Sequence, residues 1–184
     1  MVAEMQKKSP NQRAAELGVP FGVYFSAMSV AIIYSDQTSI VSILALAMLV
    51  GTPFVLYALL RKCYRDDNGF TEYSGLWMTG ILICIYGALI TGLVTFLVFH
   101  FLRPDYFYEL LQQMIKIYNS STEPDMVEMT KILKGIVANG NVPRPIEVVF
   151  TNFWLVSFAG SIMSAIVSFV VKKVPLRNEN ENEN

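Results

Sequence analysis

The stretch GLWMTGILICIYGALITGLVTFLVFHFL, residues 75–102, contains no Asp, Glu, Lys or Arg side chain over its whole length. An α-helix needs about 20 apolar residues to cross the hydrocarbon core of a bilayer. Because no water is present there to pair with backbone groups, a segment that spans the core satisfies them internally as a helix. The stretch is therefore predicted to be a transmembrane helix.

Three more uncharged apolar stretches flank this one, at residues 17–34, 40–60 and 148–171. Hydrophobic residues make up 53% of the chain and the mean hydropathy is +0.43, whereas apolar residues including Gly make up about 45–50% of a soluble protein. We predict an all-α membrane protein, in which four transmembrane helices form a left-handed bundle. Residues 1–174 would be a single domain, and residues 175–184 a disordered acidic tail in which Asn and Glu alternate.

The first stretch has two interpretations, because basic residues precede it as they do in a signal peptide. A signal peptide has an apolar region of about 7–15 residues followed by a small-residue cleavage site. This stretch is longer, and no such site follows it. We expect an uncleaved first span.

Basic residues concentrate in alternate connecting segments. Nine of the 14 Lys and Arg residues lie within residues 1–16, 61–74 and 172–184, and the other five are spread over the loop 103–147. Cytoplasmic segments of membrane proteins carry an excess of Lys and Arg. We expect both termini and the loop 61–74 in the cytoplasm, and the turn 35–39 and the loop 103–147 outside.

Small residues recur at spacings of three and four in three of the spans, which places them on one face of each helix. They are Gly22, Ser26 and Ser29; Gly80, Cys84, Gly87 and Thr91; and Ser157, Ser161, Ser164 and Ser168. Small residues let membrane helices approach closely, and this spacing is typical of a left-handed seam. The alternative, a polar lining around a pore, lacks the charged residues that mark ion pathways. Thr52–Pro53 should bend the second span.

The loop 103–147 carries two apolar stripes at helical spacing. They are Phe107, Leu110, Leu111, Met114, Ile115 and Tyr118, and Met129, Ile132, Leu133 and Ile136. Between them, residues 119–121 break the pattern, and Thr122 and Asp125 resemble a capping box with Pro124 in the first turn. We predict a helical hairpin over residues 105–138 that lies against the outer membrane surface. Its apolar faces could instead pack internally or present a surface to a partner.

Side chains able to carry chemistry are few. The only histidine, His100, and Glu147 are candidates for an enzyme site near the outer surface, but no nucleophile–base pair accompanies them. Cys63 is expected in the loop after the second span and Cys84 within the third, too far apart in depth for a disulfide. Residues 66–69, DDNG, are predicted to form a turn rather than a calcium loop. We predict no catalytic, cofactor-binding or metal site, and no nucleic-acid partner.

The connecting motifs are similar to those of a known family. RKCYRD at residues 61–66 leads to GFTEY at 69–73, and the third span leads to RPDYF at 103–107, with Lys172–Lys173 closing the last span. Over residues 15–174 the chain resembles the four-span bacterial membrane proteins catalogued as domain of unknown function 4199. The resemblance implies a bacterial cytoplasmic (inner) membrane location, and it implies no established activity.

Two functions of different classes fit these features. The first is a non-enzymatic membrane protein that acts by association, through its helix faces or the outer hairpin, with a second copy or another membrane protein. The alternative is a subunit of a small oligomeric transporter or channel, whose path would rely on Ser, Thr and backbone groups. In both cases the lipid bilayer surrounds most of the chain.

Overall fold

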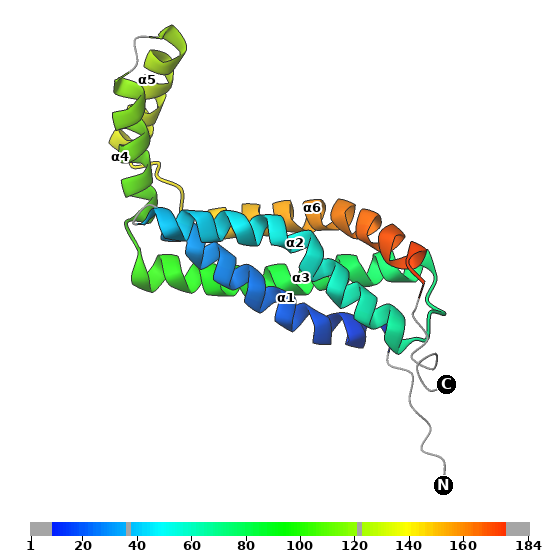
Figure 1. Cartoon of the computed structure of the whole chain (residues 1–184). Coiled ribbons are helices and arrows are strands. Elements are labelled where there is room, and N and C mark those ends of the chain that lie inside the picture. Colours follow the sequence, from blue (N-terminus) through cyan, green and yellow to red (C-terminus); the bar gives the residue numbers. More distant parts are fainter. Residues whose placement is uncertain (1–8, 36–37, 121–122, 176–184) are drawn as a thin grey trace. The chain divides into compact units, whose positions relative to one another are not determined.

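The computed structural model describes residues 9–35, 38–120 and 123–175, and all the regular structure within these ranges is helical (Figure 1). Four helices are long and apolar enough to cross a membrane. They have 24–29 residues each and are α1 (Pro10–Ile33), α2 (Ser39–Asp66), α3 (Tyr73–Leu97) and α6 (Pro145–Lys173). At 1.5 Å per residue they are roughly 36–44 Å long, which exceeds the ~30 Å hydrocarbon core. The predicted all-α class and the four apolar spans are confirmed, while the left-handed twist stays a prediction.

The helices extend beyond the predicted spans, and one prediction about Cys63 is wrong. Cys63 lies in the last turns of α2, where its side chain is buried, rather than in a loop. The helix continues past the apolar run because its sequence holds no breaker until Asn68 and Gly69, which adopt φ angles of 52° and 79°. These left-handed angles suit Asn and Gly. They form the turn predicted from DDNG.

Pro53 lies inside α2, and the helix changes direction along its length (Figure 1). Proline supplies no backbone N–H and its ring crowds the preceding turn, so a bend is expected here. The Thr52 hydroxyl donates to the Met48 carbonyl oxygen at 3.2 Å, and the Tyr24 hydroxyl of α1 donates to the same oxygen. The bend in α2 is thus tied to α1 by a side-chain hydrogen bond.

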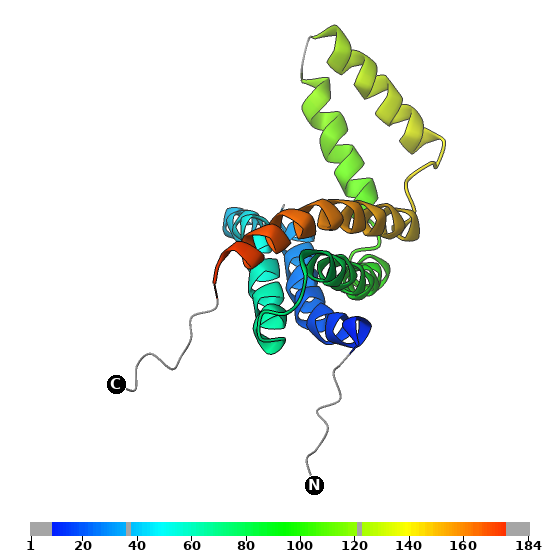
Figure 2. The ribbon, with the colours of Figure 1, turned by 90° about the vertical axis from the view of Figure 1, so that its right-hand side faces the viewer.

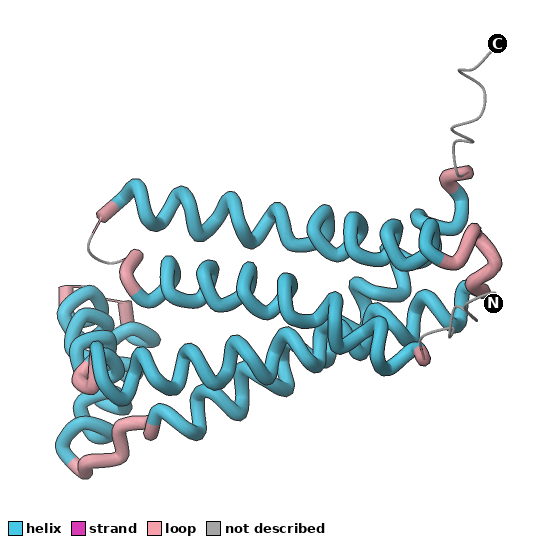
Figure 3. Tube along the Cα trace, turned by 90° about the horizontal axis from the view of Figure 1, so that it is seen from below, coloured by secondary structure: helices cyan, strands magenta, loops and turns pink. Residues whose placement is uncertain are grey.

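The chain divides into two compact units. The first holds α1, α2, α3 up to Leu93 and α6 from Asn152. Figure 2 looks along these long helices, and Figure 3 shows the loops gathered at helix ends. All four helices contribute to the apolar core, which comprises Ala14, Phe21, Phe25, Met28, Leu56, Leu60, Leu76, Ile83, Cys84, Val167 and Val171.

The outward faces of the long helices in this unit are also apolar. Ile43, Phe54 and Phe158 are 69–70% exposed in the isolated chain. A soluble protein rarely exposes so many large apolar side chains together. In a bilayer these faces contact lipid tails, so the exposure agrees with the four predicted spans.

Polar contacts join helices at the end of this unit where α1 begins and α2 ends. The Arg13 guanidinium donates to an Asp67 carboxylate oxygen at 3.5 Å, and the Thr71 hydroxyl donates to the other oxygen at 2.6 Å. Arg61 of α2 donates to backbone carbonyls at the end of α6. Carbonyls in the last turn of a helix lack intrahelical partners, and basic side chains commonly supply them.

The second unit, residues Val94–Thr151, contains the loop 103–147 and the helix ends that adjoin it. A π-helical turn, Val98–Leu102, ends the third span and precedes α4 (Tyr106–Asn119) and α5 (Pro124–Ala138). α4 and α5 pack on one another as a hairpin. The capping prediction needs correction, because Glu123 is the N-cap of α5 and makes no side-chain capping bond. Thr122, like most of the predicted acidic tail, lies outside the described residues.

Candidate functional site

The first candidate surface for association is the set of small-residue faces on the spans. The atoms nearest each glycine show whether these faces are already covered by another helix of the same chain. A side-chain carbon on Gly80 of α3 would lie 2.8 Å from the Ser164 side chain of α6. A carbon on Gly160 of α6 would lie 2.7 Å from Cys84. Such distances leave no room for a larger residue, so α3 and α6 meet at a tight seam.

α3 also packs closely against α1. A side-chain carbon on Gly87 would come within 2.6 Å of Phe21, and one on Gly22 within 2.8 Å of Ile90. The Thr91 hydroxyl donates to the Gly22 carbonyl oxygen at 3.4 Å. The predicted stripe of α3 therefore divides between two partners, with its first half on α6 and its second half on α1.

The serine stripe of α6 is only partly internal. Ser164 and Ser168 are fully buried, whereas Ser157 and Ser161 are partly exposed. Two aromatic residues also belong to this contact. The Tyr73 hydroxyl donates to the Ala165 carbonyl oxygen at 3.2 Å, and the Trp77 indole N–H donates to that of Ser161 at 3.1 Å. The small-residue faces thus serve the fold of one chain and leave little surface for a partner.

Several hydroxyl groups within the spans bond to their own helix, whereas those of Thr95, Ser157 and Ser168 are buried without a hydrogen-bond partner among the described residues. The Ser26, Thr79 and Ser161 hydroxyls each donate to the carbonyl oxygen four residues earlier, at 2.7–2.8 Å. Such bonds satisfy a hydroxyl within its own helix. The arrangement favours packing of the helices over a polar lining for a transport path.

The α4–α5 hairpin is the second candidate surface. Its two helices contact one another, and Phe107 of α4 and Thr130 and Leu133 of α5 are buried. The predicted stripe of α5 was only partly right, because Met129 and Ile132 are exposed. A single neighbouring helix covers a narrower arc than the full apolar stripe, so part of the stripe stays uncovered.

Four of the uncovered apolar residues lie on one side of the hairpin, whereas Tyr108 and Val127, which are 49% and 41% exposed, lie on the other side. Leu110 and Ile117 of α4 are 39% and 65% exposed, and Met129 and Ile132 of α5 are 45% and 53% exposed. Helical periodicity places the first two on one flank of α4 and the last two on one flank of α5. In an antiparallel pair with Phe107 and Leu133 facing inward, these flanks share a side. We call these four residues the hairpin apolar face.

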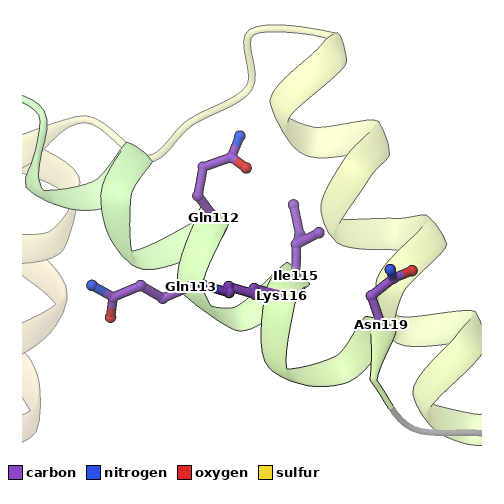
Figure 4. A pocket seen from close by; sticks show the side chains of 5 residues that line it. All are labelled: Gln112, Gln113, Ile115, Lys116 and Asn119. Atoms are coloured by element: carbon purple, nitrogen blue, oxygen red, sulfur yellow. The ribbon is translucent and has the colours of Figure 1, made fainter.

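The other side of the hairpin is mixed, with polar side chains beside Tyr108 and Val127. The Lys134 ammonium of α5 donates to the Asn119 side-chain oxygen of α4 at 3.4 Å, which places both residues on this side. A shallow hollow of about 400 Å³ follows α4 (Figure 4). It is lined by Gln112, Gln113, Ile115, Lys116 and Asn119. Amides and one ammonium can form hydrogen bonds there, but they do not make an acid–base pair.

Aromatic contacts fix the start of the hairpin to the end of the third span. The Phe99 ring in the π-helical turn lies 4.6 Å from the ring of Phe107 and 5.3 Å from that of Tyr106, between centroids. Arg103 donates to the Glu109 carboxylate at 2.7 Å and lies over the Tyr106 ring at 5.2 Å. The first turn of α4 is therefore held by the span that precedes it.

The two candidate enzyme residues have structural partners. The His100 ring stacks on Phe96 with centroids 5.7 Å apart and meets Phe101 edge to face at 4.7 Å. Glu147 lies in the first turn of α6 and accepts from the Arg144 backbone N–H at 3.3 Å. Among the described residues no group of three His, Cys, Asp or Glu side chains is placed to hold a metal ion.

Comparison with known proteins gives one match. A family model described as protein of unknown function DUF4199 matches residues 16–173. The chain belongs to the DUF4199 family. No curated protein and no solved structure matches it.

The DUF4199 match includes α1 from Glu16 onward and the whole of α2 to α6, and it ends at Lys173. The matched region therefore contains most of the first apolar helix, the other three apolar helices and the α4–α5 hairpin. The resemblance inferred from the connecting motifs is confirmed. The family description names no activity, so it assigns no role to individual residues.

Proposed function

We propose that this DUF4199 protein is a non-enzymatic integral membrane protein that acts by association with another membrane-anchored chain. We further propose a bacterial inner membrane as its location, with both termini in the cytoplasm and the hairpin outside. The hairpin apolar face carries the proposal. We expect this loop outside the hydrocarbon core from the distribution of Lys and Arg, and there the lipid tails around the spans would not cover its apolar residues.

Three features support association over the alternative of a transporter or channel subunit. The small-residue faces are occupied within the chain, and the hydroxyls of Ser26, Thr79 and Ser161 bond to their own helices. The spans of the first unit carry apolar side chains on their outward faces. A second copy of the chain is the partner that can be tested without other components.

The test uses the full chain in liposomes, with separate donor and acceptor dyes on two batches. Energy transfer between copies should exceed the value for random mixing. Ile117→Asp combined with Ile132→Asp places two charges on the hairpin apolar face, and we expect transfer to fall to the random value. Gln112→Asp with Gln113→Asp adds the same charge to exposed polar residues of α4 and should leave transfer unchanged.

Circular dichroism on each variant checks that the helices are retained. Transfer in the double isoleucine variant equal to that of the unaltered chain would refute the assignment to this face. Random-level transfer in the unaltered chain would refute association between copies. Substrate flux in liposomes that requires the same four spans would favour the transporter alternative.

A further inference from the structure

The middle of α2 has two features that weaken its backbone ladder. Pro53 supplies no N–H, so the Leu49 carbonyl has no donor four residues further along the helix. The Thr52 hydroxyl donates to the Met48 carbonyl oxygen at 3.2 Å, and hydroxyl bonds of this kind often bend helices. The angle between the two halves of α2 is therefore less restrained here than in a regular helix. We call this turn the Pro53 hinge.

The half of α2 that precedes the hinge has few contacts with the rest of the chain. Within residues 39–51 only Ala45 is buried, and Ile40, Ile43 and Leu44 are 54–75% exposed. A segment with few buried contacts opens at a lower free energy than a packed segment. We call residues 39–51 the α2 arm.

The half of α2 that follows the hinge is packed. Thr52, Leu56, Leu60 and Cys63 follow one another at intervals of four, four and three residues, and all four are buried. Leu56 and Leu60 belong to the apolar core of the four helices. Arg61 in addition donates to carbonyl oxygens at the end of α6. This half is fixed to the other helices, so the α2 arm is the part that is free to change its angle.

One hydrogen bond holds the α2 arm against α1 close to the hinge. The Tyr24 hydroxyl of α1 donates to the Met48 carbonyl oxygen, and the Tyr24 side chain itself packs against the core. Gly51 leaves room for this bond, because a side-chain carbon there would lie 2.9 Å from the Tyr24 hydroxyl oxygen. The bond therefore joins a fixed side chain of α1 to the weakly held half of α2.

The start of the α2 arm is tied to the end of α1 in a different way. Only residues 34–38 separate α1 from α2, and the Ser42 hydroxyl donates to the Ser35 carbonyl oxygen at 2.8 Å. Among the described residues, this bond and the Tyr24 bond are the side-chain hydrogen bonds between the arm and other segments. The short connection limits any movement of the arm to a change of bend angle.

We propose that the α2 arm has two positions and that the Tyr24 hydroxyl sets the balance between them. In the closed position Tyr24 bonds to Met48. In the open position this bond is broken, and the arm turns about the Pro53 hinge away from α1 while its start stays beside the end of α1. The hinge changes the surface that α1 and α2 present within the membrane. It goes beyond the proposed association and does not depend on the hairpin apolar face.

The test measures the distance between spin labels on the α2 arm and on α3 by pulsed electron paramagnetic resonance, with the full chain in liposomes. The labels are attached at Ile43→Cys and Leu93→Cys, which replace side chains that are 69% and 63% exposed. The labelled chain also carries Cys63→Ala and Cys84→Ala. Unlabelled chains are added in excess, so that each measured distance lies within one molecule. We expect two distances, of which the longer belongs to the open position.

Two variants break the Tyr24 bond from opposite helices. Tyr24→Phe removes only the hydroxyl and should raise the ratio of open to closed arm roughly threefold, the factor to which an average hydrogen bond between membrane helices corresponds. Gly51→Ala keeps Tyr24 but fills the space of its hydroxyl, so the ratio should rise again. Tyr57→Phe is the matched control and should leave the ratio unchanged, because the Tyr57 hydroxyl makes no hydrogen bond within the described part of the chain.

Pro53→Ala tests the hinge itself, because alanine restores the backbone donor. In that background Tyr24→Phe should have no effect on the ratio. An unchanged ratio in both Tyr24→Phe and Gly51→Ala would overturn the proposal, as would a single distance in every variant. An equal effect of Tyr24→Phe with and without Pro53 would also overturn it, since the movement would then not depend on the hinge. If one variant fails to fold, the other still tests the same bond.

Discussion

Single residues decide how closely the helices approach. Ser164 is fully buried, and its side chain lies against Gly80 and 3.9 Å, sulfur to oxygen, from the Cys84 thiol. Two helices can come this near only where glycine or another small residue stands on each side. The sequence shows the serine stripe, but it does not show which of the serines are buried. The structure shows that Ser164 and Ser168 are fully buried.

Replacing Ser164 with Leu should therefore destabilise the protein. The larger side chain must push α3 and α6 apart, and overpacking of this kind costs about 1–3 kcal/mol. The melting temperature in detergent should fall by several degrees. Ser161→Leu should have a smaller effect, because Ser161 is partly exposed. Ile162→Leu on the exposed side should change nothing, and an unaltered melting temperature for Ser164→Leu would show that the seam is loose.

At the scale of elements, local signals in the sequence were sufficient to find the helices. Apolar runs without charge located the four spans, and DDNG located the turn that follows α2, although the helix runs six residues past the predicted span. Contacts between distant segments could not be foreseen, since Gly80 and Ser164 lie 84 residues apart and no pattern pairs them. The π-helical turn at Val98–Leu102 and the burial of Thr130 likewise depend on neighbours that the sequence does not reveal.

The hairpin α4–α5 should depend on an apolar cover for its structure. It is too short for a core of its own, because domains below about 40 residues usually need disulfides, metals or partners. Both cysteines lie in other helices and are free. A peptide of residues 103–145 should be largely unfolded in buffer and gain helix in micelles, as measured by circular dichroism. A cooperative helical fold in buffer alone would indicate an autonomous ectodomain instead.

At the scale of the whole molecule, the distribution of charge predicts how the chain crosses the membrane. Nine of the 14 Lys and Arg residues lie in residues 1–16, 61–74 and 172–184, whereas the loop between the third and fourth spans carries the hairpin apolar face. We expect the basic segments in the cytoplasm and the loop outside. The four spans make this arrangement possible, and the orientation remains the central prediction.

The topology of the chain in intact cells tests this prediction most directly. Cys63 and Cys84 are replaced by Ala, and single cysteines are placed at Ser9, Ser120 or Asn182. An impermeant thiol reagent added to intact bacteria should label only the cysteine at position 120, because the hairpin faces outward. Cells opened by detergent should label all three. Labelling of either terminal cysteine in intact cells, or protection of position 120, would contradict the orientation.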